Sequence, residues 1–122
     1  MRKIIGLFLI HLLSSQLHAQ ITDTIPFEDA NGKWGIKIHS SEKVLVEPKY
    51  QYLDYSYEGL IKARLNDKTG FIDLSGKIIV PFKYHDANYF AEGLAAVSQE
   101  TKSGWKIGFV DKTGKLVIEM KY

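Results

Sequence analysis

The chain has 122 residues, no cysteine, and 16 basic against 14 acidic side chains, for a formal net charge of +2. This length allows one small domain or a short repeat array and excludes a large multidomain enzyme. With 45% hydrophobic and 25% charged residues, the composition is that of an ordinary globular protein. The absence of cysteine excludes disulfides, thiolate zinc sites and thiol nucleophiles.

Residues 1–19 have the order of a secretory signal peptide. A basic start at Arg2 and Lys3 precedes an apolar run over residues 4–13, and a polar stretch then ends at Ala19. As a helix, the apolar run covers about 15 Å, which is too short for a hydrocarbon core of about 30 Å. We therefore expect cleavage between Ala19 and Gln20, export to the periplasm or the medium, and no membrane span afterwards.

Removing the predicted signal peptide leaves 103 of the 122 residues and changes the charge. Arg2 and Lys3 are lost and no acidic residue is, so 14 basic and 14 acidic side chains remain. A chain without excess positive charge has no electrostatic basis for binding nucleic acid or anionic lipid. We therefore expect no nucleic-acid partner.

The rest of the chain contains an internal repeat. The block from Gly70 to Tyr84 recurs from Gly108 to Tyr122, and a version one residue longer runs from Gly35 to Tyr50. Each block ends in Lys-Tyr, and a Glu-Gly pair follows the first two blocks at the same spacing. The predicted organisation is an N-terminal linker over 20–30 and about two and a half units at 31–58, 59–92 and 93–122.

Each unit has the pattern of a three-stranded β-meander. Short apolar runs rich in β-branched residues alternate with turn sequences, and no stretch has the periodicity of a long amphipathic helix. The segments 73–76 and 111–114 place Asp and Gly where a tight hairpin turn needs unusual backbone angles. Pro48 and Pro81 lie near the ends of third strands, where a missing N–H costs little. We expect the steps between a tyrosine and the next Glu-Gly pair to form at most a turn or a single helical turn.

A single meander cannot bury both of its faces, so the units must stack or continue one sheet. We therefore predict an all-β fold in which tandem three-stranded meanders form a small twisted β-array. The last unit ends at Lys-Tyr without the Glu-Gly strand that follows the earlier ones. That arrangement leaves a C-terminal edge open to self-association.

Several motif elements recur in order at near-constant spacing. They are Lys33-Trp34-Gly35, the blocks Gly-Phe-Ile-Asp and Gly-Phe-Val-Asp with their Gly-Lys turns, the Lys-Tyr ends, and Glu92-Gly-Leu-Ala95. Over residues 31–122 this set resembles the WG-repeat (KWG-repeat) family. The repeat-defining positions are Trp34, Gly35, Gly70, Asp73, Gly76, Gly108, Asp111 and Gly114.

The resemblance implies an array of short β-units, found in bacterial and often exported proteins, that serves as an interaction or accessory region without shared catalytic residues. The chain departs from the motif at its tryptophan, which is replaced by Thr69 in the second unit and displaced to Trp105 in the third. A role that needs a regular tryptophan ladder is therefore not expected.

Carboxylates at repeat-equivalent positions are the candidate catalytic groups. Glu58 and Glu92, or Asp73 and Asp111, could in principle flank a glycosidic bond. Because the same positions recur in successive units, roles in turns and in capping backbone groups explain them better.

Other chemical motifs are weak. His39 and His85 have no partner at the spacing of metal ligands. Neither a phosphate-binding glycine loop nor a Gly-x-Ser-x-Gly nucleophile elbow occurs in the sequence. We therefore expect no enzyme activity, no cofactor and no metal.

Aromatic side chains crowd the two connections between units. Two pairs of tyrosines are repeat-equivalent and are expected to fill the core: Tyr50 with Tyr84, and Tyr55 with Tyr89. Tyr52 and Tyr57 match Asp86 and Ala91, so the repeat does not require an aromatic ring at either position. Since tyrosine is enriched at interfaces, Tyr52 and Tyr57 are the candidates for contact with a ligand or partner.

The sequence thus predicts an exported, non-catalytic binding or accessory module whose partner is a protein or another component of the cell envelope. The alternative is an envelope glycan-binding or glycan-hydrolysing domain that uses the aromatic connections and the repeat carboxylates. A hydrolase predicts a cleft with a perturbed acid pair, whereas a repeat module predicts carboxylates spread over equivalent turns.

Export can be tested on the protein recovered from its producing cell. N-terminal sequencing is expected to begin at Gln20, because the signal peptide is removed during translocation. Recovery from the cytoplasm with Met1 retained would contradict the export prediction.

Overall fold

The computed structural model describes residues 23–121. The predicted signal peptide and its cleavage site between Ala19 and Gln20 lie outside the described residues. No helix in the described part is long and apolar enough to cross a membrane.

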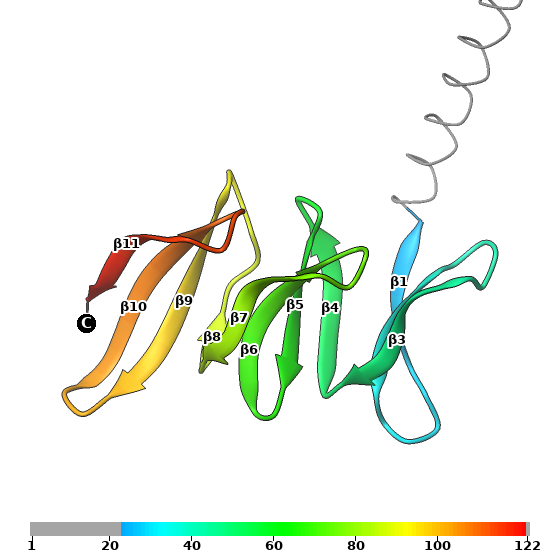
Figure 1. The fold of residues 1–122 in the computed structure, drawn as a ribbon, viewed down its shortest axis with the longest axis horizontal. Helices are drawn as coiled ribbons and strands as arrows, with labels where there is room; N and C mark the ends of the chain where they lie inside the picture. The colour runs from blue at the N-terminus through cyan, green and yellow to red at the C-terminus, as the bar shows by residue number, and fades with distance from the viewer. Residues whose placement is uncertain (1–22, 122) are drawn as a thin grey trace, which may run out of the picture.

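Within residues 23–121, eleven antiparallel strands form three sheets that follow one another in a row (Figure 1). The first sheet consists of β1 (Thr24–Glu28), β2 (Trp34–Ile38) and β3 (Val44–Tyr50). The second consists of β4 (Tyr52–Tyr57), β5 (Leu60–Leu65), β6 (Lys68–Asp73) and β7 (Ile78–Tyr84). The third consists of β8 (Asp86–Ala87), β9 (Leu94–Thr101), β10 (Gly104–Asp111) and β11 (Leu116–Lys121). The predicted all-β class is confirmed.

The second and third sheets each contain one strand more than a three-stranded meander. The residues after Tyr50, expected to form a turn, form β4, and the residues after Tyr84 form the short β8. Tyrosine favours strands, and β4 contains three tyrosines, at positions 52, 55 and 57. Each connection therefore belongs to the sheet that follows it, and the sheets begin just after a tyrosine instead of at the predicted unit boundaries.

The predicted linker over 20–30 is wrong for residues 24–28, which form β1. This strand pairs with β2 along its whole length, from Thr24 opposite Ile38 to Glu28 opposite Trp34. The prediction missed it because β1 has no sequence counterpart in the repeat blocks. Its hairpin has one: Asp29-Ala-Asn-Gly-Lys shares the Asp-x-x-Gly-Lys pattern of the two later turns.

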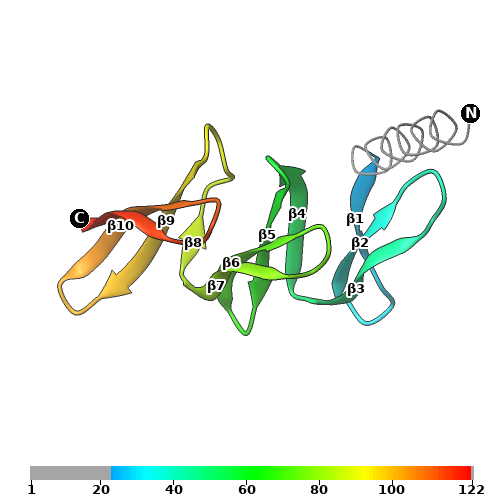
Figure 2. The same cartoon turned by 45° about the horizontal axis from the view of Figure 1, so that its top comes forward.

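Two hydrophobic cores lie between the sheets, so the middle sheet is buried on both faces (Figures 1 and 2). The core between the first and second sheets contains Ile36, Val46, Tyr50, Leu53, Ile61, Ala63 and Ile72. The core between the second and third contains Leu60, Phe71, Val80, Tyr84, Ala87, Phe90, Ala95, Val97 and Val110. The units therefore stack face to face.

The repeat glycine of each sheet faces a bulge in the neighbouring strand. Gly35 of β2 stands opposite residues 47–49 of β3, and Gly70 of β6 stands opposite residues 81–83 of β7. Three residues thus face one, which bends the longer strand. Proline occurs in both bulges, at Pro48 and Pro81, on edge strands where its missing N–H is tolerated.

The bulge brings backbone against the glycine. A Cβ atom on Gly70 would lie 2.5 Å from the carbonyl oxygen of Val80, and one on Gly35 would meet the carbonyl oxygen of Val46 equally closely. Any side chain at these two positions would force the strands apart. After the bulge, the chain turns Tyr50 and Tyr84 into the two cores.

Replacing Gly70 by alanine is expected to lower the free energy of unfolding by about 3 kcal/mol, because the added methyl group overlaps the backbone of β7. Urea unfolding measures the change. The matched control is Gly59→Ala, at a residue with a positive φ of 78° and open space around it. It should cost only the left-handed strain of about 1 kcal/mol. A smaller loss for Gly70→Ala than for Gly59→Ala would refute the close-approach explanation.

Candidate functional site

The tyrosines of the connections lie partly in the core and partly at the surface. Tyr50 and Tyr84 are buried. Tyr55 and Tyr89 are about half exposed, so the prediction that this pair fills the core is wrong. The core position at the second junction is taken by the neighbouring Phe90, whose ring packs edge-on against a phenylalanine of β6.

The irregular register of the connections explains the exposure of Tyr55 and Tyr89. Pairing between β4 and β5 shifts between Leu53 and Ser56, so Tyr55 lies in the irregular stretch. Its N–H donates to the Oδ1 atom of Asp54 at 2.8 Å. Tyr89 comes two residues after the end of β8 and also lies outside the regular ladder. Repeat equivalence therefore does not determine which way these rings point.

The two predicted contact residues, Tyr52 and Tyr57, lie on β4 and are both partly exposed. The ring of Tyr57 stacks on that of Tyr89, with centroids 4.4 Å apart and planes 24° apart. The ring of Tyr52 lies 6.1 Å from that of Trp34 in the first sheet. Tyr57 thus contacts the segment between β8 and β9 of the third sheet, and Tyr52 contacts the first sheet.

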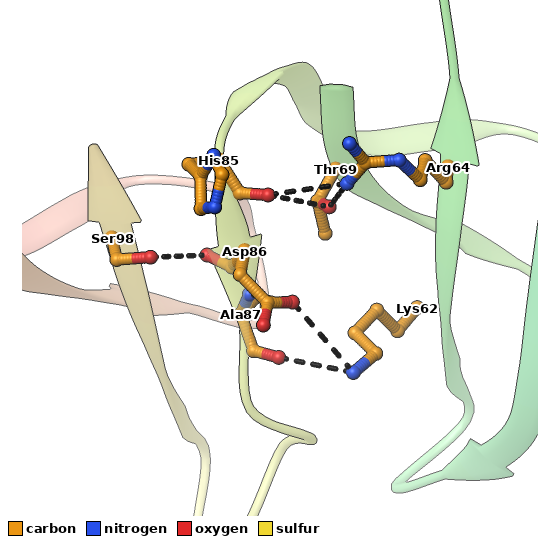
Figure 3. A network of polar contacts seen from close by, with 7 residues as sticks. All are labelled: Lys62, Arg64, Thr69, His85, Asp86, Ala87 and Ser98. Atoms are coloured by element: carbon orange, nitrogen blue, oxygen red, sulfur yellow. Dashed lines mark hydrogen bonds and ion pairs between the residues drawn. The ribbon is translucent and has the colours of Figure 1, made fainter. Parts of the chain in front are cut away.

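Lys62 of β5 points toward Asp86 and Ala87 of β8 (Figure 3). Its Nζ atom donates to the carbonyl oxygen of Ala87 at 3.2 Å and lies 3.9 Å from Oδ1 of Asp86. It also lies 5.9 Å from the centroid of the Tyr89 ring, within cation–π range. We define the tyrosine surface as Tyr52, Tyr57, Lys62, Asp86 and Tyr89.

Arg64 and Thr69 of the second sheet bind the backbone of His85, the residue before Asp86 of the tyrosine surface (Figure 3). A guanidinium nitrogen of Arg64 and the hydroxyl of Thr69 both donate to the carbonyl oxygen of His85 at 3.3 Å. From the other side, the hydroxyl of Ser98 donates to the carbonyl oxygen of Asp86 at 3.4 Å. The segment 85–86 is therefore anchored both to the second sheet and to β9 of its own sheet.

The motif tryptophan position contacts the next sheet in each case where that sheet is described. Trp34 does so through its ring against Tyr52, and Thr69 does so through its hydrogen bond to His85. The displaced Trp105 packs edge-on against the ring of His85, at 4.5 Å between centroids. In the second unit, Thr69 thus exchanges the ring packing of the motif tryptophan for a hydrogen bond.

An open hollow of about 270 Å³ adjoins the tyrosine surface. Tyr52, Lys62, Arg64, Thr69 and Asp86 line it. This volume is below the roughly 300–1,000 Å³ of typical small-molecule sites. The arrangement suits contact with a protruding side chain better than enclosure of a whole ligand.

Tyr52 keeps its proton near neutral pH. Burial raises the pKa of its hydroxyl above the usual value of 10.0, and the charge of Asp54 and the neighbouring hydroxyls of Tyr89 and Tyr57 act in the same direction. Tyr52 can therefore donate as well as accept a hydrogen bond at the rim of the hollow.

Asp73 closes the turn between β6 and β7. Its Oδ1 atom accepts hydrogen bonds from the N–H of Ser75 at 2.9 Å, from the hydroxyl of Ser75 at 2.6 Å and from the N–H of Lys77 at 3.0 Å. Gly76 supplies the required positive φ of 88°. Burial alone would raise the pKa of Asp73, but these hydrogen bonds outweigh it and hold the pKa below 3.8.

Asp111 closes the turn between β10 and β11 in the same way. Its Oδ1 atom accepts from the N–H and hydroxyl of Thr113 and from the N–H of Lys115. Hydrogen bonds from Thr113 are the main reason that the pKa of Asp111 lies below its usual value. A general acid needs a raised pKa, so both aspartates are shifted away from that role.

Glu58 and Glu92 occupy the first position of two-residue turns and have positive φ values of 53° and 52°. The Oε1 atom of Glu58 accepts the N–H of Gly93 at 3.0 Å, across the junction between the second and third sheets. Sequence reasoning missed this contact because the two residues are 35 positions apart. Glu58 thus links two successive turns.

His39 lies in the turn after β2, and His85 lies between β7 and β8. Within residues 23–121, no group of three histidine or carboxylate side chains is placed to hold a metal ion.

Comparison with known families gives matches to the family described as WG containing repeat, over residues 37–68, 70–102 and 107–122. These ranges cover more than half of the chain. The first range runs from the end of β2 into β6, so it spans the junction between the first two sheets. Comparison with curated proteins and with solved structures gives no match.

The lowered pKa of Asp73 predicts a pH-dependent contribution to stability. Because the folded-state pKa is below the unfolded value of 3.8, the contribution is present above that value and is lost as the pH falls through the folded-state pKa. Asp73→Ala is expected to lower the free energy of unfolding by about 1 kcal/mol at neutral pH. The difference from the wild type should shrink in acid.

Urea unfolding at a series of pH values measures this difference. Glu119→Ala is the control, since this exposed carboxylate accepts no hydrogen bond from the described residues. A pH-independent loss for Asp73→Ala would contradict the proposed role of the ionised carboxylate.

Proposed function

The chain belongs to the WG-containing repeat family, and from this premise we propose that it is an exported, non-catalytic binding module. Its contact surface is the tyrosine surface, and its partner is a protein of the cell envelope. The observation that carries the proposal is the stack of Tyr57 on Tyr89, whose rings remain 40% and 51% exposed.

The stack is suited to binding because its rings are already ordered. Tyr57 and Tyr89 restrict each other, and Lys62 lies within cation–π range of the second ring. Side chains ordered before association lose less conformational entropy when a partner binds. Large exposed aromatic side chains with this property are typical of interface hot spots.

The fold does not require aromatic rings at positions 52 and 57. The position of Tyr57 carries Ala91 in the next unit, and the position of Tyr52 carries Asp86. Both smaller residues occur in a unit that forms its own sheet. The extra aromatic surface at the second junction is therefore best explained by contact with another molecule.

The mixed chemistry of the surface favours a protein over a glycan. Tyrosine hydroxyls, the ammonium group of Lys62 and the carboxylate of Asp86 lie next to apolar rings, as in the rims of protein interfaces. Glycan stacking needs free ring faces, whereas Tyr57 and Tyr89 cover one face of each other.

The engagement of the repeat carboxylates supports a non-catalytic role. Asp73 and Asp111 accept hydrogen bonds within their own turns and have lowered pKa values. Glu58 accepts a backbone N–H at a sheet junction. These environments stabilise ionised, structural carboxylates, unlike the paired acid and base of a glycan hydrolase.

Export is supported by the order of basic, apolar and polar segments over residues 1–19, with Ala19 before the cleavage point. A neutral net charge after cleavage fits a partner recognised by shape and aromatic contact more than by long-range charge.

The test is capture of partners from the producing cell's envelope fraction by the wild-type protein and by the variant Tyr57→Ala/Tyr89→Ala. The double variant is expected to weaken capture at least about tenfold, since loss of a hot-spot pair costs more than 1.4 kcal/mol. Quantitative mass spectrometry identifies the captured protein, and titration of that purified protein measures the dissociation constants.

Tyr55→Ala is the matched control, because Tyr55 is as exposed as these two rings but lies outside the tyrosine surface. Equal capture by wild type and double variant would overturn the proposed surface. Capture of a polysaccharide that depends on Tyr57 and Tyr89 would favour the glycan-binding alternative. Turnover of that polysaccharide, abolished by alanine at Glu58 or Asp73 without unfolding, would overturn the non-catalytic proposal.

A further inference from the structure

Each sheet has a row of cross-strand neighbours on the face that is directed toward the C-terminal end of the array. Residues paired across an antiparallel ladder lie on the same face, so the register defines these rows. They are Pro26–Ile36–Val46 in the first sheet, Lys62–Phe71–Val80 in the second and Ala96–Phe109–Ile118 in the third.

The first two rows are covered and the third is open. Phe71 and Val80 are 1% and 0% exposed beneath the third sheet, and Ile36 is equally buried beneath the second. In the third sheet, Ile118 is 47% exposed and its neighbour Ile107 is 49% exposed. The outer face of the third sheet is thus apolar, like the equivalent faces of the first and second sheets, which are buried. No described residue covers it.

A hollow beside this face supports the same comparison. It measures about 220 Å³, and its lining includes Ala96, Ser98 and Ile107. The equivalent positions in the second sheet are Lys62, Arg64 and Thr69, which line the hollow that Asp86 of the third sheet enters. The hollow of the second sheet is therefore partly lined by the next sheet, whereas the equivalent hollow of the third sheet is lined by the third sheet alone.

The opposite end of the array is different. The rows on the faces that point toward a preceding sheet are Ile61–Ile72–Ile78 in the second sheet and Ala95–Val110–Leu116 in the third, and their first two residues are buried. The corresponding row of the first sheet is Ile25–Lys37–Val44. A lysine thus replaces the buried central residue of the other two rows.

Lys37 makes the outer face of the first sheet a polar cap. Its ammonium group forms an ion pair with Glu42 and lies 5.4 Å from the centroid of the Phe27 ring. Covering this face with another sheet would bury both charges, which costs several kcal/mol unless new partners compensate. Head-to-tail stacking of two copies, the first sheet of one on the third sheet of the other, is therefore disfavoured.

We propose that the outer face of the third sheet is an interface with a second copy of this chain, and that the two copies meet through this same face around a twofold axis. Such an isologous contact places apolar side chains against apolar side chains in both copies and closes after two subunits. Like the chain's own junctions, it buries apolar side chains between two sheets, but it joins two identical faces, whereas each internal junction joins opposite faces of successive sheets. The proposal concerns the face of the sheet, whereas the sequence alone pointed to its edge, and it does not rest on the proposed function.

The molar mass of the purified protein, obtained from expression of the full chain, provides the first test. Sedimentation equilibrium at about 100 µM is expected to give twice the monomer mass, because dimerisation follows mass action. Ile118→Lys should return the mass to that of the monomer, a twofold decrease. Ile78→Lys is the matched control: Ile78 is 53% exposed but lies in the second sheet, so this variant should remain dimeric. Circular dichroism establishes that both variants are folded.

Single cysteines provide a second test that leaves the face apolar, and the chain contains no other cysteine. In an isologous interface a residue near the axis meets its own counterpart. Under mild oxidation, Ile118→Cys or Ile107→Cys should therefore form disulfide-linked dimers, whereas Ile78→Cys should not.

A wild-type monomer at about 100 µM would overturn the proposal. A mass that keeps rising with concentration would also overturn it, because open growth indicates head-to-tail contacts.

Discussion

The close approach of backbone to the repeat glycine is the constraint on which the stacked array depends. Gly35 and Gly70 each face three residues of the next strand, and the carbonyl oxygens there leave no room for a Cβ atom. The resulting bulge turns the closing tyrosines of the first two sheets, Tyr50 and Tyr84, into the core beneath the following sheet. The bulge opposite the glycine thus places the tyrosine in the core, which explains why the two residues recur together at near-constant spacing.

Stacking makes the three sheets unequal, because within residues 23–121 only the middle one is buried on both faces. No described residue covers the outer faces of the first and third sheets, and these two faces differ in chemistry. The first sheet presents an ion pair between Lys37 and Glu42, while the third presents Ile107 and Ile118. A polar cap at one end and an apolar face at the other give the array a direction, which nearly identical repeats would otherwise lack.

Local chemistry determined which features could be predicted from the sequence. The turns at Asp73 and Asp111 depend on residues within four positions of each other, so their pattern is readable. β1 was missed because its strand has no repeat counterpart, although the Asp-x-x-Gly-Lys pattern at Asp29 marks its hairpin. The contact of Glu58 with Gly93 depends on packing between sheets, and the bulge in β4 depends on its pairing with β5. The irregular pairing also decides that Tyr55 is exposed, which repeat equivalence alone does not reveal.

The tyrosine surface belongs to a junction and to no single sheet. Tyr57 comes from β4, Tyr89 from the segment after β8, and Lys62 from β5. Their approach requires the second and third sheets to be docked, which Arg64 and Thr69 secure through the carbonyl oxygen of His85. A partner that binds these rings therefore binds only the stacked form, so its binding energy adds to the stability of the junction. In this architecture, new contact surfaces arise by substitution at the junctions, while the glycines, turns and buried tyrosines that build each sheet stay unchanged.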